Sequence, residues 1–138
     1  MKKILIFASV LLLLPVCVAS AQIASPVRFS MNTSFAAGNA TFPAGSYEIR
    51  PTDDQGVFEI RSEDGRHGAL VEVEPLDTDT PFKQTELVFN KYGNNMVLKE
   101  VTVAGGTTGI NILTSHLERR HRKAFGKPTR VRHPAKKK

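Results

Sequence analysis

Hydrophobic and polar residues alternate along most of the chain between residues 27 and 112, and this alternation predicts β-strands. In the first stretch Val27, Phe29 and Met31 alternate with polar neighbours, which places one face in a core and the other in solvent. The pattern recurs between turn residues, and the seven predicted strands cover residues 27–31, 47–50, 57–61, 69–74, 85–91, 96–103 and 107–112. Seven short strands with regular turns predict a mainly all-β fold, a small antiparallel β-sandwich or barrel with a short C-terminal helix.

Turn residues separate the predicted strands. Pro43 and Gly45 favour a turn, because proline presets φ and glycine accepts positive φ. Asp64 and Gly65 form a dipeptide that is typical of a β-hairpin. The stretch 96–103 is apolar on both faces, which predicts a central strand. The β-rich domain is therefore assigned to residues 22–113.

The pattern changes to helical spacing near residue 115. Ser115 and Glu118 fit a capping box, in which the serine accepts from a backbone N–H and the glutamate reaches back to the cap. Apolar and aromatic positions then recur at helical spacing, at Leu113, Leu117, His121 and Ala124. This predicts a short helix within residues 114–126, which would pack a narrow apolar stripe on the β domain. Residues 127–138 are predicted to be a disordered basic tail.

The first 21 residues have the three parts of a signal peptide. Two lysines precede an apolar run at residues 4–14, and Ala19, Ser20 and Ala21 form an A-x-A cleavage site. We expect cleavage between Ala21 and Gln22. A membrane anchor is the alternative, but a spanning helix needs about 20 apolar residues, and this run stops at Pro15. The sequence thus predicts an exported protein that is periplasmic, associated with the outer envelope, or extracellular, with no transmembrane segment after cleavage.

Cys17 is the single cysteine of the chain. A lipoprotein signal also places a cysteine after an apolar run, but Gly, Ala or Ser normally precedes it, whereas Val16 stands here. Cleavage after Ala21 removes Cys17, so the mature chain would be free of cysteine and without disulfides. Its stability would then depend on the hydrophobic core.

Charge is divided along the chain. Residues 22–118 contain 13 acidic and 7 basic residues, a balance of −6, and no acidic residue follows Glu118. The last 20 residues hold ten basic side chains, which are Arg119, Arg120, Arg122, Lys123, Lys127, Arg130, Arg132, Lys136, Lys137 and Lys138. These ten residues are the predicted site for binding an anionic surface. Aromatic residues are missing after Phe125, so base stacking and sequence-specific nucleic-acid binding are not expected.

Several of these motifs occur together in one known group of proteins. The sequence contains Pro43-Ala44-Gly45-Ser46-Tyr47, then the stretch 87–93 (LVFNKYG), then Gly109 followed by Ser115 and Glu118. In this order it resembles a group of short exported bacterial β-rich proteins of unknown function with PAGxY and LVFxxYG motifs. The resemblance covers residues 27–118, and Phe42 stands where leucine is expected. It implies a β-rich exported domain and no catalytic residues.

Candidate chemistry is sparse. His116 and His121 are five positions apart on the predicted helix, whereas a zinc pair prefers i, i+4 spacing. Ser115, His116 and Glu118 have the residue types of a hydrolytic triad, but adjacent helical positions do not face each other. The chain shows no dinucleotide fingerprint, phosphate-binding loop or calcium loop. No catalytic, cofactor or metal residues are therefore assigned, and no cofactor is expected.

The leading functional hypothesis is an exported, non-enzymatic β-sandwich module with a structural or binding role at the cell envelope. Its basic tail would act as an electrostatic tether to lipid head groups or lipopolysaccharide, with extracellular DNA as a further anionic surface. One alternative is a carbohydrate-binding or carbohydrate-active domain, although tryptophan is absent and only Tyr47 and Tyr92 are available for sugar stacking. Another is an enzyme whose site residues meet only in space. The sequence leaves the oligomeric state open.

Overall fold

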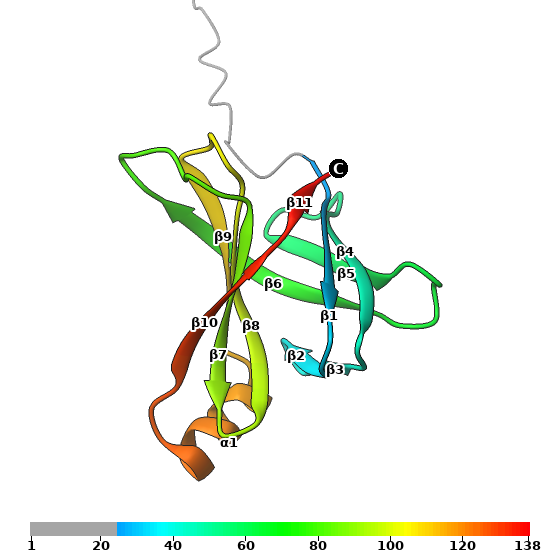
Figure 1. Cartoon of the computed structure of the whole chain (residues 1–138), viewed down its shortest axis with the longest axis vertical. Coiled ribbons are helices and arrows are strands. Elements are labelled where there is room, and N and C mark those ends of the chain that lie inside the picture. The colour runs from blue at the N-terminus through cyan, green and yellow to red at the C-terminus, as the bar shows by residue number, and fades with distance from the viewer. Residues whose placement is uncertain (1–24) are drawn as a thin grey trace, which may run out of the picture.

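The computed structural model describes residues 25–138, so the predicted signal peptide and Cys17 lie outside the described residues. Within that range the chain is mainly β and has one short helix (Figure 1). The elements in order are β1 (Val27–Met31), β2 (Phe35–Ala37), β3 (Ala40–Phe42), β4 (Gly45–Pro51), β5 (Val57–Ser62), β6 (Gly68–Asp77), β7 (Glu86–Tyr92), β8 (Asn95–Thr102), β9 (Thr108–Ile112), α1 (His116–Phe125), β10 (Thr129–Pro134) and β11 (Lys136–Lys137).

The eleven strands of the described range form one mixed sheet. Its order is β10-β7-β8-β9-β6-β5-β4-β1-β11, and the β2–β3 hairpin joins β8 through one parallel pairing of Ala36 with Val97. The other pairings are antiparallel. The predicted mainly-β class is confirmed, but the count of seven strands is wrong. The strands β2 and β3 have only three residues each, which is too short for an alternating pattern to stand out.

The C-terminal segment is ordered as strands, so the prediction of a disordered tail over 127–138 is wrong. β10 pairs with β7 along six residues, and after Ala135 the strand β11 pairs with β1. The C-terminal segment therefore pairs with β7 through β10 and with β1 through β11. Without this segment, β7 and β1 would be the two end strands of that strand order. The prediction of disorder relied on the high density of positive charge. It overlooked Val131 and His133, which alternate with Arg130 and Arg132 as in a strand. Glu86 of β7, Glu100 of β8 and Glu48 of β4 compensate part of the charge.

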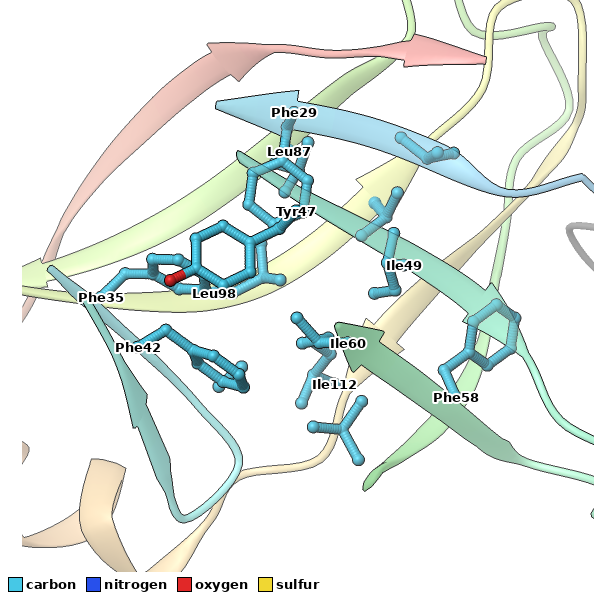
Figure 2. Close-up of a cluster of buried hydrophobic side chains, with 14 of the residues drawn as sticks. Phe29, Phe35, Phe42, Tyr47, Ile49, Phe58, Ile60, Leu87, Leu98 and Ile112 are labelled. Atoms are coloured by element: carbon cyan, nitrogen blue, oxygen red, sulfur yellow. The ribbon is translucent and has the colours of Figure 1, made fainter. Parts of the chain in front are cut away.

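An aromatic cluster forms the part of the main core beside β2 and β3 (Figure 2). The Phe35 ring is 5.1 Å from the rings of Phe42 and Tyr47, 5.7 Å from Phe29 and 5.9 Å from Phe89, measured between centroids. Such pairs contribute about 0.5–1.5 kcal/mol each beyond the burial of their area. The short strand β2 is therefore fixed by packing and not by strand propensity.

A second, smaller cluster lies between α1 and the sheet. It contains Ala36, Tyr92 and Val97, and Leu117 of α1 packs against it. The strand β8 thus has buried residues on both faces, as expected from the apolar residues on both faces of the stretch 96–103. The apolar contribution of α1 is narrower than predicted, because Ala124 is exposed and Leu113 is 40% exposed.

The PAGxY segment forms the turn into β4. The buried Tyr47 hydroxyl donates a hydrogen bond to the backbone carbonyl of Pro43, four residues earlier. Gly45 adopts φ 157°, close to extended backbone. The motif residues therefore act structurally here, because the tyrosine ring fills the core and its hydroxyl fixes the turn.

Replacing Tyr47 by phenylalanine should lower the free energy of unfolding by about 1–2 kcal/mol. The substitution keeps the ring in the core but leaves the Pro43 carbonyl without its hydroxyl donor. Urea unfolding followed by circular dichroism measures the change. Tyr92→Phe is a useful comparison, since it removes a hydroxyl from the second cluster, and an unchanged midpoint for Tyr47→Phe would show that the turn does not depend on this bond.

Candidate functional site

The most distinctive polar feature is a buried carboxylate at the junction of α1 with the sheet. Glu118 is 1% exposed and is the buried residue of α1. Its Oε1 accepts hydrogen bonds from Asn90 Nδ2 and from the Tyr92 hydroxyl, both at 2.9 Å. Both donors belong to β7, where Asn90 and Tyr92 are two positions apart and therefore project from the same face. The arrangement joins the helix to the outer face of the sheet.

Lys99 of β8 completes this polar cluster. Its Nζ lies 3.5 Å from Glu118 Oε2, and its side chain is only 14% exposed. The ammonium also donates to the Ile112 carbonyl at 2.8 Å and to Thr114 Oγ1 at 3.0 Å. A buried charge is costly unless it is paired and hydrogen-bonded. Here both charges have several partners, so the pair acts as a specific attachment of α1.

The start of α1 is held by two side chains. Ser115 Oγ accepts from the Glu118 N–H at 3.0 Å, as the capping box predicts. Asn39, in the turn between β2 and β3, accepts from the Leu117 N–H at 3.1 Å through its Oδ1. The second half of the predicted box is wrong, because the Glu118 side chain points to β7 and not back to the cap. Asn90, Tyr92 and Lys99 offer the carboxylate three donors. The Ser115 backbone N–H of the predicted box would offer only one.

Arg122 and His121 border the cluster on the helix side. Arg122 Nη2 donates to the Tyr92 hydroxyl at 3.3 Å and lies 3.9 Å from Glu118 Oε1. The His121 ring stacks on Tyr92 with centroids 6.2 Å apart. Burial raises the pKa of Tyr92, the hydrogen bond from Arg122 lowers it, Glu118 raises it, and the net direction is upward. Tyr92 therefore stays a neutral donor near pH 7.

This geometry anchors the helix, and it does not bring Ser115, His116 and Glu118 together as a hydrolytic triad. Ser115 and Glu118 meet through a backbone N–H and not through their side chains, and His116 is exposed on the opposite side of α1. Nucleophile, base and orienting group therefore do not converge as acyl transfer would require. The Glu118 carboxylate is occupied by donors from β7 and β8.

The four histidines lie in four different settings. His67 is exposed in the β5–β6 hairpin, His116 is exposed on α1, and His121 stacks on Tyr92. His133 of β10 donates through Nε2 to the Ser30 carbonyl at 2.7 Å. Among residues 25–138, no group of three or more His, Cys, Asp or Glu side chains is placed to hold a metal ion.

The ten basic residues of the predicted anionic-surface site do not form one surface. Four of them pair with carboxylates of the same chain. Arg130 lies 2.7 Å from Glu100, and Arg132 pairs with Glu86. Lys138 lies 3.3 Å from Glu48, and Arg122 contacts Glu118 as described. These four residues therefore connect the C-terminal segment and α1 to the β domain.

Glu48 shows the effect of this internal pairing on a surface carboxyl. Its burial raises the pKa, but hydrogen bonds from Arg28 and Lys138 lower it more, so the net direction is downward. The Arg28 contact is 3.2 Å and runs across the β1–β4 ladder. Glu48 thus stays ionised and holds the C-terminal lysine to β4.

The other six basic residues are exposed and form no ion pair with the described part of the chain. Four of them gather on α1 and just after it, namely Arg119, Arg120, Lys123 and Lys127, and the remaining two are Lys136 and Lys137 of β11. Figure 1 shows α1 beyond the β7–β8 hairpin and β11 beside β1, toward the other end of the domain. Folding therefore divides the unpaired positive charge between two places.

Sequence reasoning missed Asn90, Tyr92 and Lys99 as partners of Glu118. A signal was present, because Asn90, Tyr92 and Gly93 belong to the LVFxxYG stretch. Gly93 has φ 60°, and a Cβ at this position would lie 3.0 Å from the Phe125 ring. A Cβ at Gly109 would lie 2.7 Å from the Val101 carbonyl oxygen. The two motif glycines are thus explained by close packing. Gly93 lies against α1, and Gly109 of β9 lies against β8.

Searches with this chain against protein-family models, curated proteins and solved structures found no match. Among residues 25–138, no helix has the length and apolar character needed to span a membrane.

Proposed function

We propose that this chain is an exported, non-enzymatic β module that attaches to an anionic component of the cell envelope. The observation that carries the proposal is an exposed cationic surface, formed by Arg119, Arg120 and Lys123 of α1 together with Lys127 just after the helix. These side chains make no ion pair with residues 25–138, whereas other basic residues nearby do. Phosphate-bearing lipid head groups and lipopolysaccharide present the complementary charge.

The helix places these cations on one side. At 100° per residue, Arg119, Arg120 and Lys123 fall within an arc of about 100°, and His116 lies in the same arc. Leu117 and Glu118 lie outside this arc and attach α1 to the sheet. A fixed array loses less conformational entropy on binding than a disordered tail would. This supports attachment through a rigid surface and replaces the hypothesis of a flexible tether.

The finer fold assignment belongs to the same proposal. We propose a barrel-like arrangement and not an open sandwich, because the C-terminal segment pairs with β7 through β10 and with β1 through β11. Without β10 and β11, the strands β7 and β1 would be the end strands of this order. Because one segment covers the outer edges of both β7 and β1, fewer strand edges would remain open for non-specific association.

The carbohydrate-binding alternative receives less support. Tyr47 and Tyr92 are both 1% exposed, so neither ring offers a stacking surface to a sugar. The chain has no tryptophan. The exposed Phe125, near the end of α1, is instead suited to insertion beside charged head groups.

Changing Arg119, Arg120, Lys123 and Lys127 together to glutamine should greatly weaken binding to anionic vesicles. Each basic residue near such a surface contributes about 1 kcal/mol, so loss of all four lowers the partition coefficient by about a thousandfold. Sedimentation with phosphatidylglycerol vesicles and with phosphatidylcholine vesicles measures the effect. A parallel assay with lipopolysaccharide distinguishes the two phosphate sources.

The matched control changes Arg66, Lys83, Lys136 and Lys137 to glutamine, which removes the same formal charge from other exposed positions. The proposal expects this control to lose far less affinity than the α1 variant. Equal losses in both variants would mean that only net charge matters. No binding of the unaltered protein to either anionic surface would contradict the proposal itself.

A further inference from the structure

One edge of β6 is left without a partner where β9 departs from it. β9 pairs with β6 from Asp77 to Val73, and the Leu113 N–H adds a hydrogen bond to the Glu72 carbonyl at 3.0 Å. The chain then turns into α1, because Ser115 caps that helix. Within the described range, residues 68–71 of β6 pair only with β5. We call this stretch the β6 open edge.

The ladder with β5 shows which backbone groups the open edge presents. The Val73 N–H donates to the Gly56 carbonyl, and the Ser62 N–H donates to the His67 carbonyl, both at 2.8 Å. In an antiparallel ladder the direction alternates along the strand, so residues 67, 69, 71 and 73 face β5. The N–H and C=O groups of Gly68 and Leu70 therefore point away from β5, toward the open side.

A groove of about 630 Å³ borders this edge at Leu70 and Val71, the end that lies next to the departing β9. Leu70, Val71 and Glu72 line one side, and the β2–β3 turn with Asn39 and Ala40 lines the other. The hydrogen bond from the Leu117 N–H to Asn39 joins that turn to α1, so both walls are fixed. The groove therefore exists before any ligand enters.

Apolar and basic side chains frame the groove. Leu70 is 66% exposed and Leu113 is 40% exposed, and together with Phe125 they are the exposed large hydrophobic residues of the described range. His116 and Arg119 line the end of the groove at α1. This edge of β6 thus combines main-chain N–H and C=O groups without a partner, exposed apolar side chains and a cationic end. The other edge of β6 is covered by β5.

We propose that the β6 open edge binds an extended peptide segment of another protein by strand addition. The main-chain groups of Gly68 and Leu70 would pair with the guest backbone, and its apolar side chains would contact Leu70 and Leu113. Arg119 and His116 favour a guest with an acidic residue at the end near α1. An acyl chain would leave the N–H and C=O groups unpaired, so the chemistry of the edge favours a peptide.

The open stretch also limits the length of the guest. Four residues of strand span about 13 Å. The guest therefore pairs through three or four residues, and adjacent side chains supply the rest of the contact. This site differs from the lipid or lipopolysaccharide surface in its main-chain contacts, and the two adjoin at Arg119, which belongs to both.

Selection from a random seven-residue peptide library displayed on phage tests the proposal. The full chain is the bait, and the Leu70→Pro variant is used for counter-selection. Proline at position 70 removes the N–H that faces the guest and leaves the ladder with β5 intact. We expect enriched peptides with alternating apolar residues and an acid, and an at least tenfold weaker Kd for Leu70→Pro. Leu70→Thr keeps the N–H and should weaken binding by a smaller factor.

Amide hydrogen exchange on the unaltered protein provides a readout that does not depend on the folding of a variant. Without peptide, the Gly68 and Leu70 amides should exchange faster than those of Ala69 and Val71. A saturating enriched peptide should slow exchange at Gly68 and Leu70 at least tenfold. Failure to enrich any peptide over Leu70→Pro, or protection elsewhere only, would overturn the proposal. Concentration-dependent dimers that Leu70→Pro abolishes would also overturn it, by assigning the edge to a second copy.

Discussion

Replacing Glu118 by alanine should lower the free energy of unfolding by about 3–5 kcal/mol. The change leaves the buried Lys99 ammonium without its counter-charge and removes the acceptor for Asn90 and Tyr92. It also weakens the attachment of α1 to β7 and β8, which would then depend on Leu117, on the contacts of His121 and Arg122 with Tyr92, and on the bond from the Leu117 N–H to Asn39. Since small domains are stable by only about 5–15 kcal/mol, this is a large fraction of the total. Urea unfolding measures the shift.

Two variants define the cause of that loss. Glu118→Gln keeps an oxygen acceptor but removes the charge, so it should be less destabilising than Glu118→Ala. Glu63→Ala removes an exposed glutamate and should change stability by less than about 0.5 kcal/mol. A Glu118→Ala midpoint as high as that of Glu63→Ala would show that the buried cluster does not stabilise the domain.

Removing residues 129–138 should abolish cooperative unfolding or lower stability by about 3 kcal/mol or more. The deletion removes the six-residue ladder with β7 and the pairing with β1. It uncovers the core beside Phe89, against which Val131 and Ala135 pack. Each ladder hydrogen bond contributes about 0.5–1.5 kcal/mol net, so the loss of several is comparable to the stability of a small domain. Near-ultraviolet circular dichroism and urea unfolding measure the effect.

The matching control keeps the full length and changes Lys136 and Lys137 to glutamine. Both side chains are exposed and their strand pairs with β1 through the backbone, so we expect a stability change below about 0.5 kcal/mol. A truncated chain that unfolds at the same urea concentration as this control would show that the C-terminal strands are not needed. The same comparison matters for envelope binding, because a truncation would confuse loss of fold with loss of charge.

The contrast between β1 and β10 shows how far the sequence alone could be interpreted. In β1 the buried positions are Val27, Phe29 and Met31, and large apolar side chains make the period of two obvious. In β10 the inward positions include only Val131 and His133, which alternate with Arg130 and Arg132. The positive charge of β10 therefore obscured its strand pattern in the sequence. In the fold, Glu100 of β8 and Glu86 of β7 compensate the charges of Arg130 and Arg132.

Glu118 shows a similar limit at the candidate site. The spacing of Ser115 and Glu118 correctly predicted the serine cap of α1. The same spacing gave the wrong direction for the glutamate side chain, because its partners are 19 to 28 residues earlier in the sequence, on β7 and β8. The sequence next to Glu118 does not indicate that three donors from β7 and β8 surround this side chain in the fold.

The mainly β class, the alternation of the principal strands and the serine cap of the helix follow from the amino-acid sequence alone. These features are local, since turn residues and the spacing of apolar side chains act over a few positions. The pairing of the basic C-terminal segment with β7 and β1 is visible only in the tertiary structure. The same holds for the burial of Glu118, and for the division of the unpaired cations of residues 119–138 between the α1 region and β11. Those outcomes depend on charges and backbone groups that are far apart in the chain and meet only when the sheet forms.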